Sequence, residues 1–171
     1  FKLYSNRPFP PKPLDMTVIN YWLMKSEPEA YSISDLKKEK STLWDGIRNY
    51  QARNYMRVMA IDDEAFFYHS NCKPPGIVGM MKVIKKNLID PTQFDPKAKY
   101  FDPKSSQDNP RWDCVKLSYI GVFNEIMSLD MLRNLYSPEE LPVVKKGNRI
   151  SILPVPQNTA KDLLNKLGPL R

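Results

Sequence analysis

The stretch "NYWLMKSEP", residues 20–28, is where an ordered pattern begins in this chain. Its apolar run "YWLM" is typical of a strand that is buried on both faces. Pro28 cannot donate a backbone hydrogen bond, so the strand has to end before it. Lys25, Ser26 and Glu27 therefore stand at the end of a buried strand, where loops held by a scaffold commonly form binding sites.

Two helices are predicted after this strand. The segment "SISDLKKE", residues 32–39, begins with a serine at 32 or 34 that suits an N-cap. A Trp-Asp-Gly turn at 44–46 precedes a second helix, which begins at residue 49. Apolar residues recur there at i, i+4 and i+7, so one face should pack on the core. Another face carries Asn49, Arg53 and Arg57.

The rest of the chain alternates short strands and helices without a regular strand-helix-strand repeat. Strands are expected at 64–70, 76–89, 112–123 and 148–155, and helices at 128–135 and 157–168. Gly76 and Gly79 indicate a bulge or the close approach of another backbone. Residues 90–111 form a long loop rich in proline, of a kind that is usually functional or mobile. This order favours an α+β domain around a curved or barrel-like sheet.

Length and charge narrow the class of protein. The chain of 171 residues fits one domain, and we expect residues 1–18 to form a proline-rich arm and residues 19–171 the domain. A net charge of +7 favours a polyanionic partner, of which nucleic acid is the commonest. No apolar run reaches the roughly 18 residues of a membrane span, and no leader is recognised. We therefore expect an intracellular protein with no membrane partner.

Few residues suit metal binding or hydrolysis. Cys72 and Cys114 have no metal-ligand spacing, and both are expected to be small buried side chains. His69 is the only histidine, which disfavours a zinc site and a Ser/His/Asp or Cys/His centre unless His69 itself serves. No phosphate-binding glycine motif is present. We predict no metal, no cofactor and no catalytic residues.

Recognition of a single base requires an aromatic wall, groups that read the base edge and cations for the phosphates. The candidate walls are Trp22, Trp44, Tyr68 and Trp112. The candidate edge-reading groups are Lys25, Ser26, Glu27, Asp45 and Asn71, and Gly46, His69 and Ser70 adjoin them in the predicted base-binding set. The candidate phosphate ligands are Arg48, Asn49, Arg53, Arg57 and Lys73.

Several of these residues have an equally ordinary structural explanation. Trp22 lies within an apolar strand and is more simply a core residue. Arg53 can pair with Glu27 or Asp45 as a structural ion pair. His69, taken alone, is more simply a core histidine, and it points to the opposite face of its strand from Tyr68.

The runs "NYWLMKSEP", "WDGIRNYQARNYM", "FFYHSNCKPPGIVGMMKV" and "DPTQFDPKAKYFDPKSSQDNPRW" together resemble the EVE domain, a PUA-like module. The resemblance extends from about residue 20 to the closing helix. It implies a twisted, partly closed β-barrel with short helices around it. EVE domains occur in bacterial and eukaryotic nuclear proteins, so the location implied is cytoplasmic or nuclear, and cytoplasmic for a bacterial chain.

The resemblance also implies that the chain reads modified bases in DNA or RNA, with modified cytosines prominent. The related YTH domains hold N6-methyladenine, and their Lys-Ser and Trp have counterparts in Lys25, Ser26 and Trp44. The acids Glu27 and Asp45 make the edge chemistry of this chain more acidic than in YTH domains.

We therefore expect a non-catalytic reader of a base such as modified cytosine or N6-methyladenine. Trp44 would stack on the base, and Asp45 or Glu27 would accept a hydrogen bond from its exocyclic amine. A carboxylate beside Arg48 or Arg53 should stay ionised, which disfavours a general acid. The alternatives are an enzyme that uses Asp45, Glu27 or His69 in acid-base roles, and a protein-interaction module that uses the arm and the long loop.

Overall fold

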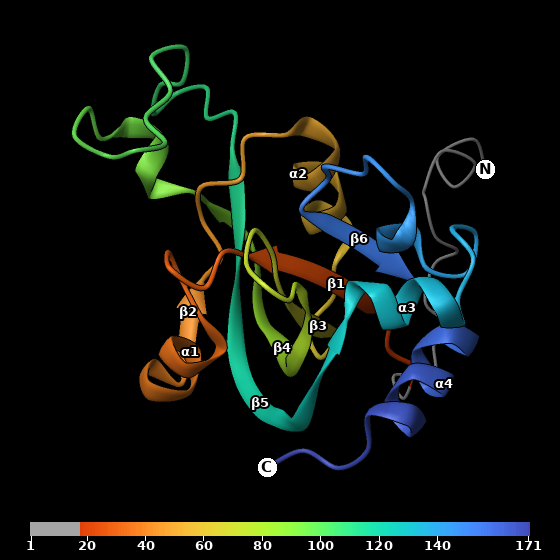
Figure 1. The fold of residues 1–171 in the computed structure, drawn as a ribbon. Coiled ribbons are helices and arrows are strands. Elements are labelled where there is room, and N and C mark those ends of the chain that lie inside the picture. Colours follow the sequence, from red (N-terminus) through yellow and green to blue (C-terminus); the bar gives the residue numbers. More distant parts are fainter. Residues whose placement is uncertain (1–17) are drawn as a thin grey trace.

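The computed structural model describes residues 18–171, so the arm predicted for residues 1–18 lies almost wholly outside the described residues. Six strands form one mixed sheet in the order β2-β5-β4-β3-β1-β6. The strands are β1 (Tyr21–Ser26), β2 (Ser41–Leu43), β3 (Glu64–His69), β4 (Gly76–Ile89), β5 (Asp113–Ser128) and β6 (Ile152–Val155). Figure 1 shows the long strand β5 running down one side of the molecule and bending at its lower end.

Four α-helices and two short 3-10 helices surround the sheet. They are α1 (Ile33–Glu39), α2 (Tyr50–Val58), α3 (Leu129–Leu135), α4 (Gln157–Leu167), η1 (Pro91–Phe94) and η2 (Pro142–Val144). Each predicted strand and helix is present, and the α+β class is confirmed. The last strand begins at Ile152 and not at residue 148, and β5 extends to Ser128 and not to residue 123. Strand β2 and the two 3-10 helices were not predicted. The edge strands β2 and β6 are not paired with each other, so the sheet is curved but open. None of the helices in residues 18–171 has the length and apolar character needed to cross a bilayer.

The helix ends follow the chemistry expected of them. Ser32 caps α1, and its hydroxyl accepts a hydrogen bond from the Asp35 N–H while the Asp35 carboxylate accepts one from the Ser32 N–H. The Asn49 side chain caps α2, and Ser128 caps α3. Gly168, at φ 77°, ends α4 in a backbone conformation that glycine adopts without strain.

Glycines allow β4 and β5 to approach closely where the sheet bends. A Cβ atom on Gly79 would lie 2.5 Å from the backbone oxygen of Gly121, and one on Gly76 would lie 2.3 Å from that of Met127. The pairing of β4 with β5 shifts register along its length, beginning between Ile77 and Gly79. The close approach predicted from these glycines is confirmed.

Hydrophobic side chains cover both faces of the central strands. On one face, Trp22 and Phe67 pack with residues of α1 and α2. On the other face, Leu23 and Phe66 pack with residues of α3 and α4. The prediction that the first strand is buried on both faces is therefore confirmed.

The two cysteines differ in their environments. Cys114 is buried, as expected, and burial raises its pKa to about 12. Cys72 is only partly buried and lies in the turn after β3, with its Sγ 3.6 Å from the Pro74 carbonyl oxygen. The expectation of a buried side chain therefore holds for Cys114 alone.

Strands β1 and β3 run parallel and side by side, with Lys25 opposite Tyr68 and Ser26 opposite His69. The chain between them forms α1, β2 and α2, as a parallel connection requires. Parallel neighbours end at the same edge of a sheet. The polar residues that follow β1 and those that follow β3 are therefore brought together.

Candidate nucleic-acid interface

Six predicted base-binding residues meet at the carboxyl ends of β1 and β3, and we call them the strand-end cluster. They are Lys25, Ser26, Glu27, His69, Ser70 and Asn71. The Ser70 N–H donates to the Ser26 carbonyl at 3.0 Å, and the Asn71 amide donates to the Glu27 carboxylate at 3.3 Å. The cluster thus offers a carboxylate, a carboxamide and hydroxyl groups at one edge of the sheet.

His69 is a hydrogen-bond acceptor in this cluster. Its Nε2 accepts a hydrogen bond from the backbone N–H of Ile33, the first residue of α1, at 3.2 Å. Burial lowers the pKa of His69. Both facts favour a neutral imidazole that carries its proton on Nδ1. His69 therefore joins the end of β3 to the start of α1.

Aromatic rings extend from His69 into the protein. The rings of His69 and Phe67 meet edge to face with centroids 5.5 Å apart, and Phe67 meets Trp44 in the same way at 5.5 Å. Trp44 is 6% exposed, so its ring lies inside the protein and not on the open surface. The row of rings connects the strand-end cluster to the Trp44-Asp45-Gly46 turn.

Asp45 and Gly46 lie beside a second acid, Asp90. The Gly46 N–H donates to the buried Asp90 carboxylate at 2.7 Å. Asp45 is exposed at the surface, yet partial desolvation and then the charge of Asp90 raise its pKa, while Arg48 lowers it. Arg48 therefore opposes the rise in the pKa of Asp45, but desolvation acts more strongly than this arginine does.

A basic loop, residues 145–150, borders the strand-end cluster. The Lys25 Nζ donates to the Asn148 carbonyl at 3.2 Å, and burial lowers the pKa of Lys25. The loop surrounds a hollow of about 270 Å³ and exposes Lys145, Lys146 and Arg149. Our reading of the sequence did not select these cations, although the run "KKGNR" at 145–149 is the signal that identifies them.

The predicted phosphate ligands of the 48–57 segment lie elsewhere. Arg48 forms an ion pair with Asp90 at 3.0 Å and donates to the Tyr100 carbonyl from Nη2 at 2.6 Å. Arg57 forms an ion pair with Asp113, and the Asn49 side chain is occupied as the cap of α2. Lys73 is exposed in the turn after β3. Arg48, in particular, braces the fold.

Arg53 belongs to an arginine-aromatic cluster that also contains Arg48, Tyr50, Arg111 and Trp112. The Tyr50 and Trp112 rings stack with centroids 4.8 Å apart, and the Arg53 guanidinium lies 4.6 Å from the Tyr50 centroid. Arg53 also donates to the Arg111 carbonyl at 2.9 Å. Arg53 does not form the suggested ion pair with Glu27 or Asp45. Its partners are aromatic rings, the Asn54 amide and a backbone oxygen.

Three predicted walls are separated from the strand-end cluster. Trp22 is fully buried, with its Nε1 donating to Asp63 at 3.1 Å. Tyr68 is 2% exposed and packs on the other face of the sheet, and burial raises its pKa to about 12. Trp112 is 5% exposed and donates to Asp102 at 2.7 Å. Of the four candidate walls, only Trp44 is connected to the cluster, and the connection runs through the Phe67 ring.

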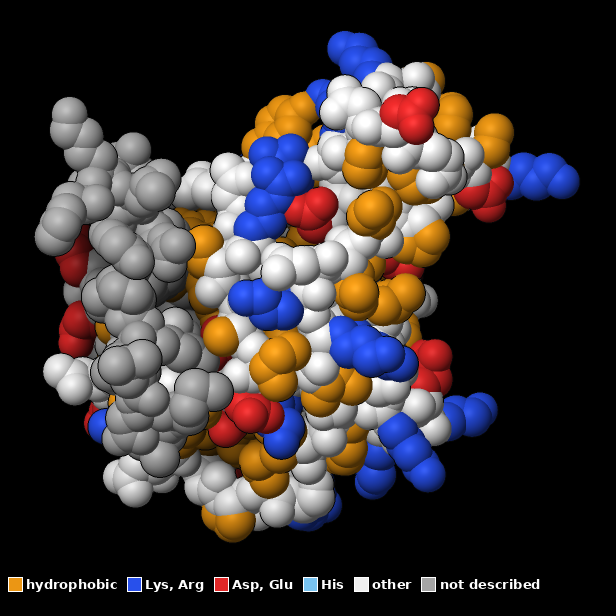
Figure 2. Space-filling view, turned by 180° about the vertical axis from the view of Figure 1, so that it is seen from behind, with side chains coloured by type: hydrophobic (Ala, Val, Ile, Leu, Met, Phe, Trp, Pro, Cys, Tyr) orange, Lys and Arg blue, Asp and Glu red, His pale blue; other side chains and the backbone are white. Residues whose placement is uncertain are grey.

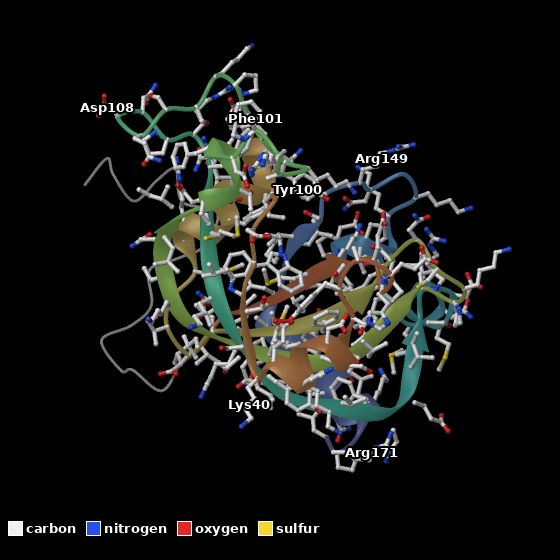
Figure 3. The ribbon with its side chains drawn as sticks, turned by 90° about the vertical axis from the view of Figure 1, so that its left-hand side faces the viewer. Lys40, Tyr100, Phe101, Asp108, Arg149 and Arg171 are labelled. Atoms are coloured by element: carbon white, nitrogen blue, oxygen red, sulfur yellow. The ribbon has the colours of Figure 1, made fainter. Side chains whose placement is uncertain are left out.

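On the face drawn in Figure 2, the described basic side chains do not form one continuous stripe. Figure 2 shows lysines and arginines in separate groups over one face, with hydrophobic side chains between them. Figure 3 shows Tyr100 and Arg149 toward the upper end of the molecule, with Lys40 and Arg171 at the lower end. The basic loop and the long loop that carries Tyr100 therefore lie at the same end of the protein.

Comparison with known proteins identifies the family. The EVE domain matches residues 20–166. Rat thymocyte nuclear protein 1 is 42% identical over 156 residues, which cover 81% of this chain and 69% of the rat protein. The crystal structure of human thymocyte nuclear protein 1 (THYN1) in complex with 5-methylcytosine containing DNA matches with a TM-score of 0.82 and 38% identity, over 89% of this chain and 99% of that one.

A YTH domain of Zygosaccharomyces rouxii, in complex with N6-methyladenosine RNA, shares the fold at a TM-score of 0.53 and 13% identity, over 96% of this chain and 95% of that one. This likeness concerns the fold alone, and with the human structure it confirms the predicted PUA-like fold. The family match and the identity to the rat protein agree with each other. The chain belongs to the EVE domain family.

Proposed function

We propose that this protein is a non-catalytic module that binds a modified base in nucleic acid at the strand-end cluster. The observation that carries the proposal is the in-register pairing of Ser26 with His69 on parallel strands, which gathers six polar residues beside a row of aromatic rings. A base site needs this combination of an apolar wall and edge-reading groups.

The groups in the cluster suit the amine edge of a base. The N4 amine of cytosine donates hydrogen bonds, and a carboxylate or an amide oxygen accepts them. Glu27 and Asn71 are exposed, and the Asn71 amide nitrogen donates to one oxygen of the Glu27 carboxylate, so both acceptor groups lie in the same part of the surface. The rings of His69, Phe67 and Trp44 supply apolar surface behind them.

Trp44 would have to become more exposed before a base could stack on it. Its ring is 6% exposed in the free protein. The Trp44-Asp45-Gly46 turn is the segment that would move, because it lies in a loop between β2 and α2. We therefore place Trp44 at the back of the pocket.

The phosphates of the bound strand would lie on the basic loop. Its three exposed cations adjoin the strand-end cluster through the bond of Lys25 to Asn148. Flipping a base out of a duplex costs a few kcal/mol, and base-aromatic stacking returns about 1–3 kcal/mol. Phosphate contacts must therefore supply much of the affinity, and binding should weaken as salt rises.

The comparisons favour modified cytosine over N6-methyladenine as the first ligand to test. The relative bound to 5-methylcytosine containing DNA is 38% identical to this chain, whereas the protein bound to N6-methyladenosine RNA is 13% identical. We also propose that the module carries out no catalysis. A nuclear location is also proposed, because curated relatives are called thymocyte nuclear protein 1.

The test is the affinity for three single-stranded heptamers that differ only at the central base: cytosine, 5-methylcytosine or N6-methyladenine. We expect 5-methylcytosine to bind most tightly, and Glu27→Gln, which removes a charged acceptor, to weaken all cytosine binding. Equal affinity for all three heptamers would overturn the proposal. Recovery of a chemically altered heptamer after incubation, detected by mass spectrometry, would favour the enzyme instead.

A further inference from the structure

Two neighbouring aromatic side chains, Tyr100 and Phe101, are exposed on the lobe formed by residues 90–112. Tyr100 is 41% exposed and Phe101 is 37% exposed. Figure 3 labels both residues on this lobe, which projects above the sheet in Figure 1. Neither residue belongs to either hydrophobic core cluster. Two large rings exposed at consecutive positions of one lobe mark a surface where another molecule can bind.

The lobe is tied down by buried polar groups. The Gln93 side chain donates to the carbonyls of Asp90 and Trp112 and accepts from the N–H groups of Arg111 and Trp112. Asp102, next to Phe101, accepts from the Trp112 indole at 2.7 Å. The two exposed rings therefore lie on a loop that is hydrogen-bonded to the residues just before β5.

Tyr100 lies directly against the Trp44-Asp45-Gly46 turn. A Cβ atom on Gly46 would lie 2.7 Å from the Tyr100 ring, so the ring rests on the glycine. Arg48 holds the same residue by donating to the Tyr100 carbonyl from Nε at 2.9 Å and from Nη2 at 2.6 Å. Tyr100 is thus continuous with the turn that borders the proposed base site.

The charges around Tyr100 suit a polyanion. The Lys99 Nζ lies 5.4 Å from the centroid of the Tyr100 ring, and the Arg48 guanidinium carbon lies 5.9 Å from it. Arg48 is held by its ion pair with Asp90, whereas Lys99 is exposed to solvent. An exposed ring beside such a lysine offers both stacking and a phosphate contact, which is how proteins hold single-stranded nucleic acid. The net charge of +7 favours the same ligand.

We propose that Tyr100, with Phe101 beside it, is a stacking platform for the nucleotide that flanks the bound base. This inference rests on the proposed function, because it needs a base at the adjacent site. The occupant is a single-stranded segment of nucleic acid, either free or extruded from a duplex. Tyr100 would read no sequence, since every base presents a face on which an aromatic ring can stack.

The test combines a change in the oligonucleotide with a change in the protein, as in a double-mutant cycle. Heptamers with a central 5-methylcytosine are made intact, with an abasic nucleotide on the 5′ side, or with one on the 3′ side. Each is titrated against the wild type, Tyr100→Ala, Tyr100→Phe and Phe101→Ala. Met131→Ala is the control, because Met131 is 49% exposed on α3, outside the lobe.

We expect one of the two abasic heptamers to bind the wild type at least about 5-fold more weakly than the intact heptamer, as the loss of one base stack predicts. Tyr100→Ala should weaken the intact heptamer by a similar factor and show no further loss with that abasic heptamer. Tyr100→Phe and Met131→Ala should behave as the wild type does.

Equal affinity of the wild type for the intact and both abasic heptamers would overturn the platform. The platform would also be overturned if the abasic nucleotide weakened binding to both Tyr100→Ala and Phe101→Ala as much as it weakens binding to the wild type. Failure of the proposed function has a different signature, since the wild type would then bind intact heptamers with cytosine and 5-methylcytosine equally. A change in Tyr100→Ala that appears only in binding to another protein would also contradict the nucleic-acid platform.

Discussion

The backbone N–H of Ile33 donates a hydrogen bond to Nε2 of His69 across 3.2 Å, and this bond links the start of α1 to the end of β3. The bond exists only while Nε2 carries no proton. Because His69 is the sole histidine of the chain, its titration can be isolated by one substitution. The contact therefore connects pH to the geometry of the strand-end cluster.

The stability of the protein should fall as pH decreases below about 6.5, the ordinary pKa of histidine. Burial lowers the pKa of native His69, so the unfolded state binds more protons between that lowered value and 6.5. Stability is then complete above 6.5 and declines below it. Urea denaturation between pH 5.5 and 7.5 measures the effect. The side chain in His69→Gln cannot titrate, so this part of the decline in stability should disappear. A decline in that variant as large as in the wild type would refute the assignment.

Arg48 should matter more to stability than to phosphate binding. Asp90 is fully buried, and Arg48→Ala removes its cationic partner, which we expect to lower the free energy of unfolding by about 3 kcal/mol. Arg57→Ala is the matched control, since its pair with Asp113 is exposed to solvent and should contribute at most about 1 kcal/mol. Chemical denaturation compares the two variants. Similar losses in both would show that Arg48 does not brace the lobe.

The basic loop should determine a measurable part of the salt dependence of binding. Each phosphate contact in single-stranded nucleic acid contributes about 0.7 to the slope of log K against log salt. The double variant Lys146→Ala/Arg149→Ala should therefore reduce the slope by about 1.4. The slope is measured by titrations between about 50 and 200 mM salt, a range that includes the ionic strength of the cell.

The control for that experiment is Lys161→Ala/Lys166→Ala on α4, which removes the same charge from a different surface. Its slope should match that of the wild type. Equal reductions in both double variants would mean that net charge, and not the basic loop, governs binding.

The elements of the fold could be predicted because their signals are local. The apolar run before Pro28, the capping residues Ser32 and Asn49, and Gly168 after the last helix each act within a few neighbouring residues. The parallel pairing of β1 with β3 has no such signal, because it joins segments about forty residues apart. The grouping of Ser26 with His69 therefore required the structure.

Only part of the candidate site could be predicted, because some of its residues have local sequence signals and others depend on long-range contacts. The polar residues at the ends of two buried strands could be selected from the sequence, because each group follows an apolar run, but their pairing is a finding of the structure. The role of Arg48 could not be read from the sequence, since its partner Asp90 lies 42 residues away. Trp112 was selected as an aromatic wall, but its stacking on Tyr50 depends on a long-range contact. The cations at 145–149 form a run in the sequence, but only the fold shows that this run lies beside Lys25.

The most direct test of the account is an amide NMR titration of the ¹⁵N-labelled protein with two heptamers that differ only in the methyl group of the central cytosine. The account predicts that the methylated strand shifts the amides of residues 25–27, 44–46 and 69–71 more strongly, and at lower concentration, than the unmethylated strand does. The amides of α4 should stay unchanged with both. Shifts confined to α3 and α4, or identical titrations with the two heptamers, would contradict the placement of a modified base at the strand-end cluster.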